Sequence, residues 1–434
     1  MASNPSRRSS TGAQRKQSGK TVASAPKHPR AVQRAGTFTT TDEVSGVSKP
    51  ADYSGWRCIF NPLWCYYGFI ISAACITVFG LLMVFSSASV DAVAQGDSPW
   101  SQLLEQGAFA VGGLVVGFML AVMPVKLFRK LSIVALGIAV LLQLATLLPG
   151  IGSSAGGNIG WIVLGPIRFQ PAEILKLCLS MWMPAAILSP KAKKLSGIKA
   201  YAEPIFGFVV AFIAVMVGHD LGTAMIIVLI GATALFVGGF PLKWFVGAGV
   251  LGAMVILLVF VSGSSNRMSR IMATYGECSE ADMEGVCYQA IHGVYAMSSG
   301  GLTGVGWGNS REKWNYLPAA HNDFIFAVIG EELGFLGASL VVLCFVLMGW
   351  CLVNIALRHQ DAYARMVLMC IAVWIVGQAM VNIGVVVGLL PVMGLPMPFV
   401  SAGGTALVMC LAASGMAVAM MRNQKDVRAA IHSA

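Results

Sequence analysis

A group of ionisable residues lies where a polar loop meets a long apolar run. The segment Lys313–Gly337 reads KWNYLPAAHNDFIFAVIGEELGFLG, so His321 and Asp323 directly precede the apolar run, and Glu331 and Glu332 lie inside it. Desolvating a carboxylate is costly, so a carboxylate at a membrane boundary usually faces a cavity, a partner or a substrate. In such a place Asp323 could act as a general base.

A structural alternative for Asp323 is helix capping. Asn and Asp are preferred N-cap residues, and Asn322 or Asp323 could begin a helix here. On a continuous helix Glu331 would lie about 80° round from Asp323 and Glu332 about 180°, so at most one would share its face. Because a cap explains neither His321 nor the two glutamates, a functional role is favoured.

Two further sites carry charge beside apolar runs. Glu173 and Lys176 are three residues apart, so they can pair on one helix face. Intramembrane ionisable residues are functional candidates, acting directly or by positioning Asp323, although a purely structural pair is the alternative. Asp220 follows His219 at a tight connection, where capping and function stay equally open.

Four basic residues flank the Asp323 segment in a predicted outer loop, where Arg and Lys are normally scarce: Arg267, Arg270, Arg311 and Lys313. They suggest an anionic ligand, and the planar donor fork of Arg suits pyrophosphate. The alternative is a solvated or headgroup-facing surface. The glycines between Gly300 and Gly308 lack the preceding strand and the GK[ST] of a nucleotide site, so they predict tight turns close to a ligand or a helix.

The composition is that of a polytopic membrane protein. The 434 residues are 56% hydrophobic and 11% charged, with a mean hydropathy of +0.74. The net charge of +10 could suggest nucleic acid, but the excess lies in the first 35 residues and in short loops. This is the pattern of cytoplasmic segments facing anionic lipid, so no nucleic-acid partner is expected.

We predict ten spans and three regions. Residues 1–60 form a disordered basic tail, 61–421 a ten-helix membrane domain and 422–434 a cytoplasmic C-terminal tail. Basic residues in alternate loops place both termini in the cytoplasm, which leaves residues 263–323 as a large outer loop. The expected spans are 66–89, 103–123, 131–149, 171–188, 205–218, 221–239, 243–262, 324–353, 363–389 and 401–421.

Two outer segments carry further expectations. The prolines between Pro391 and Pro398 prevent a continuous helix, so this stretch is predicted to form a wall of the cavity that contains Asp323. Cys278 and Cys287 share the long outer loop and could form a disulfide if that face is oxidising. The other eight cysteines are expected to pack as small hydrophobes.

With these residues in place, the chain resembles the SEDS family (shape, elongation, division and sporulation), over nearly all of its length after the tail, and is most similar to the division branch. The sequence around Asp323 resembles that of actinobacterial members of the family. The chain departs from the usual pattern of the family at three positions: it has Gly160 before Trp161, Ala319 after Leu-Pro and Trp307 between two glycines. The resemblance rests on four motifs: Gln170–Glu173 with Lys176; Asp220–Ala224; Tyr316–Pro318 with His321, Asp323–Ala327 and Gly330–Gly334; and Asn382–Gly384 followed by Leu390-Pro391, Gly394, Pro396, Pro398-Phe399, Ser401 and Gly403-Gly404.

The resemblance implies an all-α fold and a peptidoglycan glycosyltransferase that polymerises lipid II, an undecaprenyl-pyrophosphoryl disaccharide-pentapeptide, on the outer face of the plasma membrane. It implies a class B penicillin-binding protein and other division proteins as partners at the septum. It maps the catalytic aspartate to Asp323 and further functional residues to Glu173 and Lys176. We expect His321, Glu331 and Ser401 of the matched motifs to bind substrate. Arg267, Arg270, Arg311, Lys313 or a divalent cation (Mg²⁺ or Mn²⁺) would meet the pyrophosphate.

Three alternatives remain. A lipid II flippase would also use polar residues inside the membrane, although no internal repeat is evident in the sequence. An elongation-type polymerase would perform the same chemistry elsewhere in the cell. A scaffold that only recruits the penicillin-binding protein would leave the outer carboxylates unexplained.

Overall fold

The computed structural model describes residues 53, 55–94, 96–155, 158–165, 167–255, 265–276, 286–314, 316–318 and 320–433. The predicted tail therefore lies almost wholly outside the described residues. Its last residues form a short 3-10 helix, η1 (Gly55–Phe60), which leads into the first long helix. The chain from residue 55 onward is predominantly helical, as predicted.

The described part of the chain contains helices of very different lengths. In chain order they are α1 (Pro62–Ala94), α2 (Ser101–Val122), α3 (Val125–Ala145), α4 (Pro171–Ile187), α5 (Pro190–Lys194), η2 (Gly197–Tyr201), α6 (Ala202–Val217), α7 (Leu221–Val237), α8 (Leu242–Val255), α9 (Ser265–Tyr275), α10 (Val286–Ser299), α11 (Ile325–Arg358), α12 (Ala362–Ala372), the π-helical turn η4 (Val373–Gly377), α13 (Gln378–Val386), α14 (Gly404–Arg422) and α15 (Lys425–Ser433).

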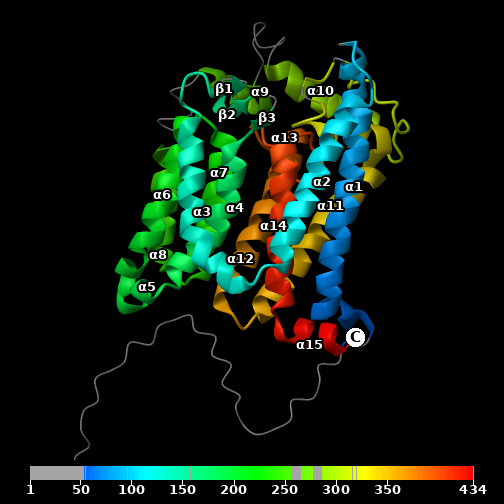
Figure 1. The fold of residues 1–434 in the computed structure, drawn as a ribbon. Coiled ribbons are helices and arrows are strands. Elements are labelled where there is room, and N and C mark those ends of the chain that lie inside the picture. Colours follow the sequence, from blue (N-terminus) through cyan, green and yellow to red (C-terminus); the bar gives the residue numbers. More distant parts are fainter. Residues whose placement is uncertain are drawn as a thin grey trace, which may run out of the picture. The chain divides into compact units, whose positions relative to one another are not determined.

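A helix occupies each of the ten predicted spans, with α12, η4 and α13 forming the ninth. By length and composition, seven described helical segments could cross a membrane, and α7 is a shorter apolar helix. The count of ten crossings and the orientation of the termini stay predictions. In Figure 1, β1–β3, α9 and α10 lie at one end of the bundle, here called the loop end, while α5 and α15 lie at the other, here called the basic end.

The centre of the bundle is built around α4, α12 and α14, whose residues are mostly buried. α2 packs along α14, and α1 packs along α11 (Figure 1). The approach of α2 and α14 is very close, because a Cβ added at Gly117 would lie 2.7 Å from the carbonyl oxygen of Leu411. Small residues allow membrane helices such contact, which contributes dispersion attraction over a long interface.

One element departs from the predicted all-α fold. The glycine-rich segment before α4 forms a three-stranded antiparallel sheet, β1 (Gly152–Ala155), β2 (Asn158–Leu164) and β3 (Ile167–Phe169), in the order β1-β2-β3. Its register pairs Ile162 of β2 with both neighbouring strands. The amide of Ile159 donates to the carbonyl of Gly218 at 2.9 Å, which attaches the sheet to the connection between α6 and α7.

Helix α11 is interrupted near its start. Gly334 has φ 65° and ψ −165°, so the helical hydrogen bonds fail around it. A glycine-rich loop supplies the missing partners. The amides of Val305 and Gly306 donate to the carbonyls of Glu331 and Glu332, and the amides of Phe335 and Leu336 donate to the carbonyls of Gly301 and Leu302. The expectation that these glycines allow close approach to a helix is confirmed, because a Cβ on Gly304 would lie 2.1 Å from the Glu332 carbonyl oxygen.

Gly304→Ala is expected to destabilise this loop by about 2 kcal/mol more than Gly308→Ala. Both glycines have φ near +80°, so both alanines carry the same backbone strain. Only Gly304 has backbone within contact distance of the added methyl group, whereas nothing lies within 4 Å at Gly308. Equilibrium unfolding of the two variants in mixed micelles measures the difference, and equal losses would show that the close approach is not needed.

The predicted outer loop 263–323 is partly helical. α9 confirms that Arg267 and Arg270 lie on a helix, although only the side chain of Arg270 is described. Cys287, at the start of α10, is disulfide-bonded. Cys278, its predicted partner, lies outside the described residues. The other eight cysteines are free, and five of them are buried.

Candidate active site

Asp323 lies in the turn that precedes α11. The N-cap of α11 is Phe324, with no side-chain cap, so the capping alternative for Asn322 and Asp323 is wrong. The Asp323 carbonyl accepts a hydrogen bond from Asn382 Nδ2 at 2.8 Å. Its carboxylate oxygen Oδ1 is inaccessible to solvent and has no hydrogen-bond partner among the described residues. A buried oxygen of this kind is available to accept a proton from a bound molecule.

The proline-rich stretch between α13 and α14 lies against this turn, and its role as the wall of a cavity stays a prediction. Ser401 Oγ donates to the Asn322 carbonyl at 2.7 Å, and the Ala402 amide donates to the His321 carbonyl at 2.9 Å. Gly394 has φ +70°, and a Cβ added there would lie 3.6 Å from Asp323 Oδ2. Ser401 therefore fixes the backbone beside the carboxylate, and Gly394 brings the loop next to the carboxylate itself.

Two charged side chains from other elements act on Asp323. Burial raises the pKa of Asp323 from 3.8 to about 6; the Arg270 guanidinium opposes this shift, and the Asp220 carboxylate adds to it. Arg270 is placed by a 3.2 Å hydrogen bond from Nη1 to the Val392 carbonyl, within the proline-rich stretch. The carboxyl group is therefore a stronger base than an ordinary aspartate and is still mostly ionised at neutral pH.

Asp220 has the capping role that its position suggested. Its Oδ1 accepts from the Thr223 amide at 2.9 Å, which caps α7. Its Oδ2 accepts from Thr223 Oγ1 and from Gln170 Nε2, at 2.8 and 3.1 Å. Asp220 therefore both caps α7 and acts electrostatically on Asp323.

Glu173 and Lys176 form the predicted pair on α4. Their charged atoms are 2.7 Å apart and the side chains are fully buried. Lys176 Nζ also donates to Gln378 Oε1 at 2.9 Å, and Gln378 Nε2 donates to the Pro396 carbonyl at 2.8 Å. The pair therefore connects through Gln378, just after the π-helical turn, to the loop that lies against Asp323. This arrangement favours the positioning alternative over direct contact with substrate.

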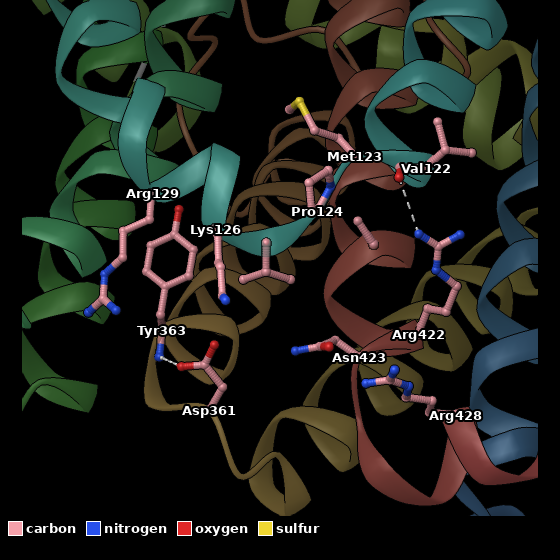
Figure 2. Close-up of a pocket in the computed structure, with 12 residues that line it drawn as sticks. Val122, Met123, Pro124, Lys126, Arg129, Asp361, Tyr363, Arg422, Asn423 and Arg428 are labelled. Atoms are coloured by element: carbon pink, nitrogen blue, oxygen red, sulfur yellow. Dashed lines mark hydrogen bonds between the residues drawn. The ribbon is translucent and has the colours of Figure 1, made fainter.

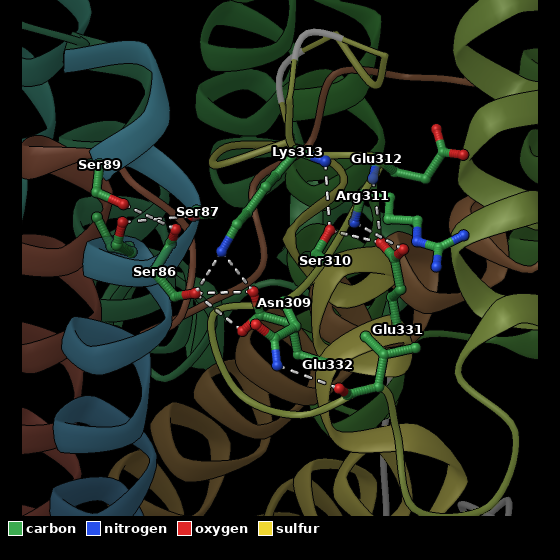
Figure 3. Close-up of polar contacts among 12 residues, drawn as sticks. Ser86, Ser87, Ser89, Asn309, Ser310, Arg311, Glu312, Lys313, Glu331 and Glu332 are labelled. Carbon is green, nitrogen blue, oxygen red and sulfur yellow. Dashed lines mark hydrogen bonds and ion pairs between the residues drawn. The ribbon is translucent and has the colours of Figure 1, made fainter. Parts of the chain in front are cut away.

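Lys313 is occupied by a buried ion pair. Its Nζ lies 2.8 Å from Glu332 Oε1, and Ser86 of α1 hydrogen-bonds both side chains (Figure 3). Releasing this ammonium to a ligand would leave Glu332 buried and unpaired, which is costly. The geometry therefore favours a structural role for Lys313 over the expected contact with pyrophosphate.

Glu331 also fastens the glycine-rich loop. Its carboxylate accepts from Ser310 Oγ at 2.5 Å, from the Arg311 amide at 2.9 Å and from the Glu312 amide at 3.4 Å (Figure 3). The side chain of Arg311 is exposed. The angles that a continuous helix would give between Asp323 and the two glutamates do not apply, because the turn at Asp323 lies outside α11 and both glutamates face the loop.

Sequence reasoning missed Gln378 and Asn382 as site residues. Both lie in an apolar span, four residues apart, and both are fully buried. Asn382 Nδ2 also donates to the Leu395 carbonyl at 2.8 Å, so it joins the turn at Asp323 to the proline-rich stretch. Their polarity within an apolar run was the available signal. Among the described residues, no group of three or more His, Cys, Asp or Glu could hold a metal ion.

The fold and this site define a class: a polytopic helical membrane protein with a buried carboxylate at one end of the bundle. The cell cycle protein family that groups FtsW, RodA and SpoVE matches residues 67–426. The chain belongs to this family, which confirms the SEDS resemblance.

Comparison with named relatives gives the same family. The chain is 33% identical to the probable peptidoglycan glycosyltransferase FtsW of Mycobacterium tuberculosis, over 92% of this chain and 76% of the relative. It is 35% identical to the stage V sporulation protein E of Bacillus subtilis, over 81% of this chain and 95% of that protein.

Solved structures share the fold. A chain from a structure described as a peptidoglycan synthase complex that coordinates polymerization and crosslinking matches with a TM-score of 0.68 and 25% identity, over 83% of this chain and 98% of that one. The rod shape determining protein RodA of Thermus thermophilus matches with a TM-score of 0.61 and 24% identity, over 83% and 97% of the two chains. The fold is therefore that of a peptidoglycan-synthesis membrane protein, as expected.

Proposed function

We propose that this chain is a peptidoglycan glycosyltransferase that polymerises lipid II on the outer face of the plasma membrane, at the division septum. The observation that carries the proposal is the Asp323 carboxylate, which has one buried oxygen with no hydrogen-bond partner among the described residues and a pKa of about 6. Relatives that share most of the chain are named as this enzyme. A class B penicillin-binding protein is the proposed partner, in keeping with the synthase complex among the matching structures.

The proposed chemistry is an inverting transfer. Asp323 Oδ1 removes the proton from the 4-hydroxyl of the acceptor sugar. At the same time the oxygen of this hydroxyl attacks the anomeric carbon of the donor. The new carbon–oxygen bond forms as the bond to the pyrophosphate breaks, and the electron pair leaves with the pyrophosphate. A base of this kind contributes about 10²- to 10⁴-fold to the rate.

The proposed positive charge comes mainly from α9. Arg270 acts on Asp323 electrostatically and contacts the proline-rich stretch, so its remaining donors are placed to meet an anionic leaving group. Arg267 and the exposed Arg311 are further candidates, and His321 remains a proposed substrate contact. Glu173, Lys176, Glu331 and Ser401 are proposed to position these groups.

The experiment that separates this function from a flippase uses the purified protein together with its class B partner. With fluorescent lipid II in detergent, we expect long glycan strands. In proteoliposomes, we expect no transfer of lipid II across the bilayer beyond that of protein-free vesicles. Scrambling without polymerisation would replace the proposal with a flippase. Depleting the protein in cells then tells division from elongation: filaments with blocked septa are expected, whereas rounding of cells would indicate an elongation role.

The polymerisation rate is expected to fall as pH drops through about 6, because Asp323 must be ionised to accept a proton. Arg270→Gln removes a charge that lowers the pKa of Asp323. The pH at which this variant loses activity on the acid side should therefore be higher than in the wild type. Asp220→Asn removes a charge that raises this pKa, so this variant should lose activity on the acid side at a lower pH than the wild type. The pH dependence of kcat/KM measures both shifts. Arg270→Lys keeps the charge and serves as the control, and shifts of the same sign in Arg270→Gln and Asp220→Asn would contradict this assignment.

A further inference from the structure

A cavity lies at the basic end of the bundle, away from Asp323. Its volume is about 600 Å³, and it is lined by the turn between α2 and α3, the start of α12, the end of α14 and the start of α15 (Figure 2). None of the residues proposed for glycosyl transfer lines it. Its chemistry therefore requires a separate account.

The charges around this cavity are strongly unbalanced. Four cations line it, Lys126, Arg129, Arg422 and Arg428, together with a single carboxylate, Asp361. Asp361 accepts a 2.9 Å hydrogen bond from the Tyr363 amide and caps α12. Three of these cations, Lys126, Arg129 and Arg422, take part in no salt bridge within the described part of the chain. Like charges around one cavity repel, and a bound anion would offset that repulsion.

Arg129 and Arg422 use little of their hydrogen-bonding capacity. Arg422 Nη2 donates to the Val122 carbonyl at 3.4 Å, and Arg129 Nη2 donates to the Leu188 carbonyl at 3.5 Å. Arg129 also lies over the ring of Tyr363 at 5.4 Å. A guanidinium carries five N–H donors, so several remain for an anion. Lys126 and Arg422 approach the cavity from opposite sides in Figure 2, as groups that share a phosphate would.

Part of the remaining lining is apolar and adjoins exposed apolar helix surface. Val122, Met123 and Val125 form the wall between α2 and α3. Just above it, Met119 is 63% exposed and Leu131 is 44% exposed. The cations stand at helix ends, which is the depth of lipid headgroups whichever way the chain is inserted. A ligand with a phosphate and acyl chains would satisfy both parts of this site.

We propose that this cavity binds the headgroup phosphate of an anionic phospholipid, with Lys126 and Arg422 as its principal contacts. The site differs from the diffuse attraction of basic loops to a charged membrane, because it depends on where the charges lie and not only on their number. Glycosyl transfer at Asp323 does not enter the argument, so the test needs no polymerisation assay.

The experiment is native mass spectrometry of the full-length protein titrated with phosphatidylglycerol, and in parallel with phosphatidylcholine. The test variant is Lys126→Gln/Arg422→Gln. The matched control, Lys193→Gln/Lys194→Gln, removes two exposed charges from α5 at the same end of the bundle but outside the cavity. Each cavity charge is expected to contribute about fivefold, so the test variant should bind phosphatidylglycerol about 25-fold more weakly than wild type.

The control variant should lose no more than about twofold, the expected effect of charge number alone under screening. Equal losses in both variants, or equal retention of the two lipids by wild type, would overturn the proposal. Displacement of phosphatidylglycerol by inorganic phosphate at the same concentration would indicate a site for a soluble anion and would also overturn it. If the double variant does not fold, Lys126→Gln alone is expected to lose about fivefold, and an unchanged affinity in that variant counts against the site.

Discussion

Asp323→Asn is expected to lower the rate of glycan polymerisation by about 10²- to 10⁴-fold while leaving the protein folded. The amide has the shape of the carboxylate but cannot take the proton of the attacking hydroxyl. Because Oδ1 has no hydrogen-bond partner among the described residues, no protein contact of that atom is lost with it. The measurement is the initial rate of strand formation from lipid II with the partner present, at pH 7.5.

Stability provides the discriminating readout for Asp323→Asn. The pKa of the folded protein, about 6, exceeds the unfolded value of 3.8, so the stability contribution of this group is full below pH 3.8 and is lost as pH rises through 6. Replacing the ionised carboxylate at neutral pH should therefore raise the free energy of unfolding, by about 1–3 kcal/mol. Asp97→Asn, an exposed carboxylate between α1 and α2, is the matched control and should change neither quantity. Near-wild-type polymerisation by folded Asp323→Asn would refute the assignment of the base.

Lys176→Met is expected to cost about 3–5 kcal/mol of stability and to abolish polymerisation. The substitution leaves Glu173 buried without its counter-charge, and it frees Gln378 from one of its partners. Gln378 in turn holds the Pro396 carbonyl in the stretch that lies against Asp323. Equilibrium unfolding in mixed micelles measures the first effect, and the lipid II assay measures the second.

The double variant Glu173→Gln/Lys176→Met tests whether the charge imbalance causes the loss of stability. Removing both charges avoids the unpaired ion, so most of the stability lost in Lys176→Met should return. Activity should return only in part, because Gln378 still lacks its lysine partner. A double variant as unstable as the single one would show that packing around Lys176, and not its charge, carries the effect.

The sequence was sufficient for the long helices of the bundle because the ten predicted spans are continuous apolar runs. The sheet was missed because two of its strands are very short and lie among glycines, although β2 alternates buried and less buried positions around Gly160 and Ile162. The break in α11 was also missed. Its cause is not local: the partners of the broken helix come from the loop at Gly301–Gly306, and only the folded chain brings the two together.

The site divides in the same way. The pairing of Glu173 with Lys176 followed from their spacing, and the proposed role of Asp323 rests on its place at the edge of an apolar run. The contacts of Lys313 could not be predicted, because Ser86 lies 227 residues away along the chain. The expectation that Lys313 meets pyrophosphate rested on charge alone. The charge of a residue does not show that it is already paired, as Lys313 is with Glu332.

The interruption at Gly334 has a mechanical consequence. The glycine-rich loop is hydrogen-bonded to the backbone of α11 on both sides of the break, to Glu331 and Glu332 before it and to Phe335 and Leu336 after it. The side chains of Glu331 and Glu332 add further contacts to the segment that follows the loop. The loop therefore bridges the break, and Gly334 is not a free hinge between the two parts of α11. A load applied to the loop is shared by both parts of the helix, and it reaches the turn at Asp323 through the first turns of α11.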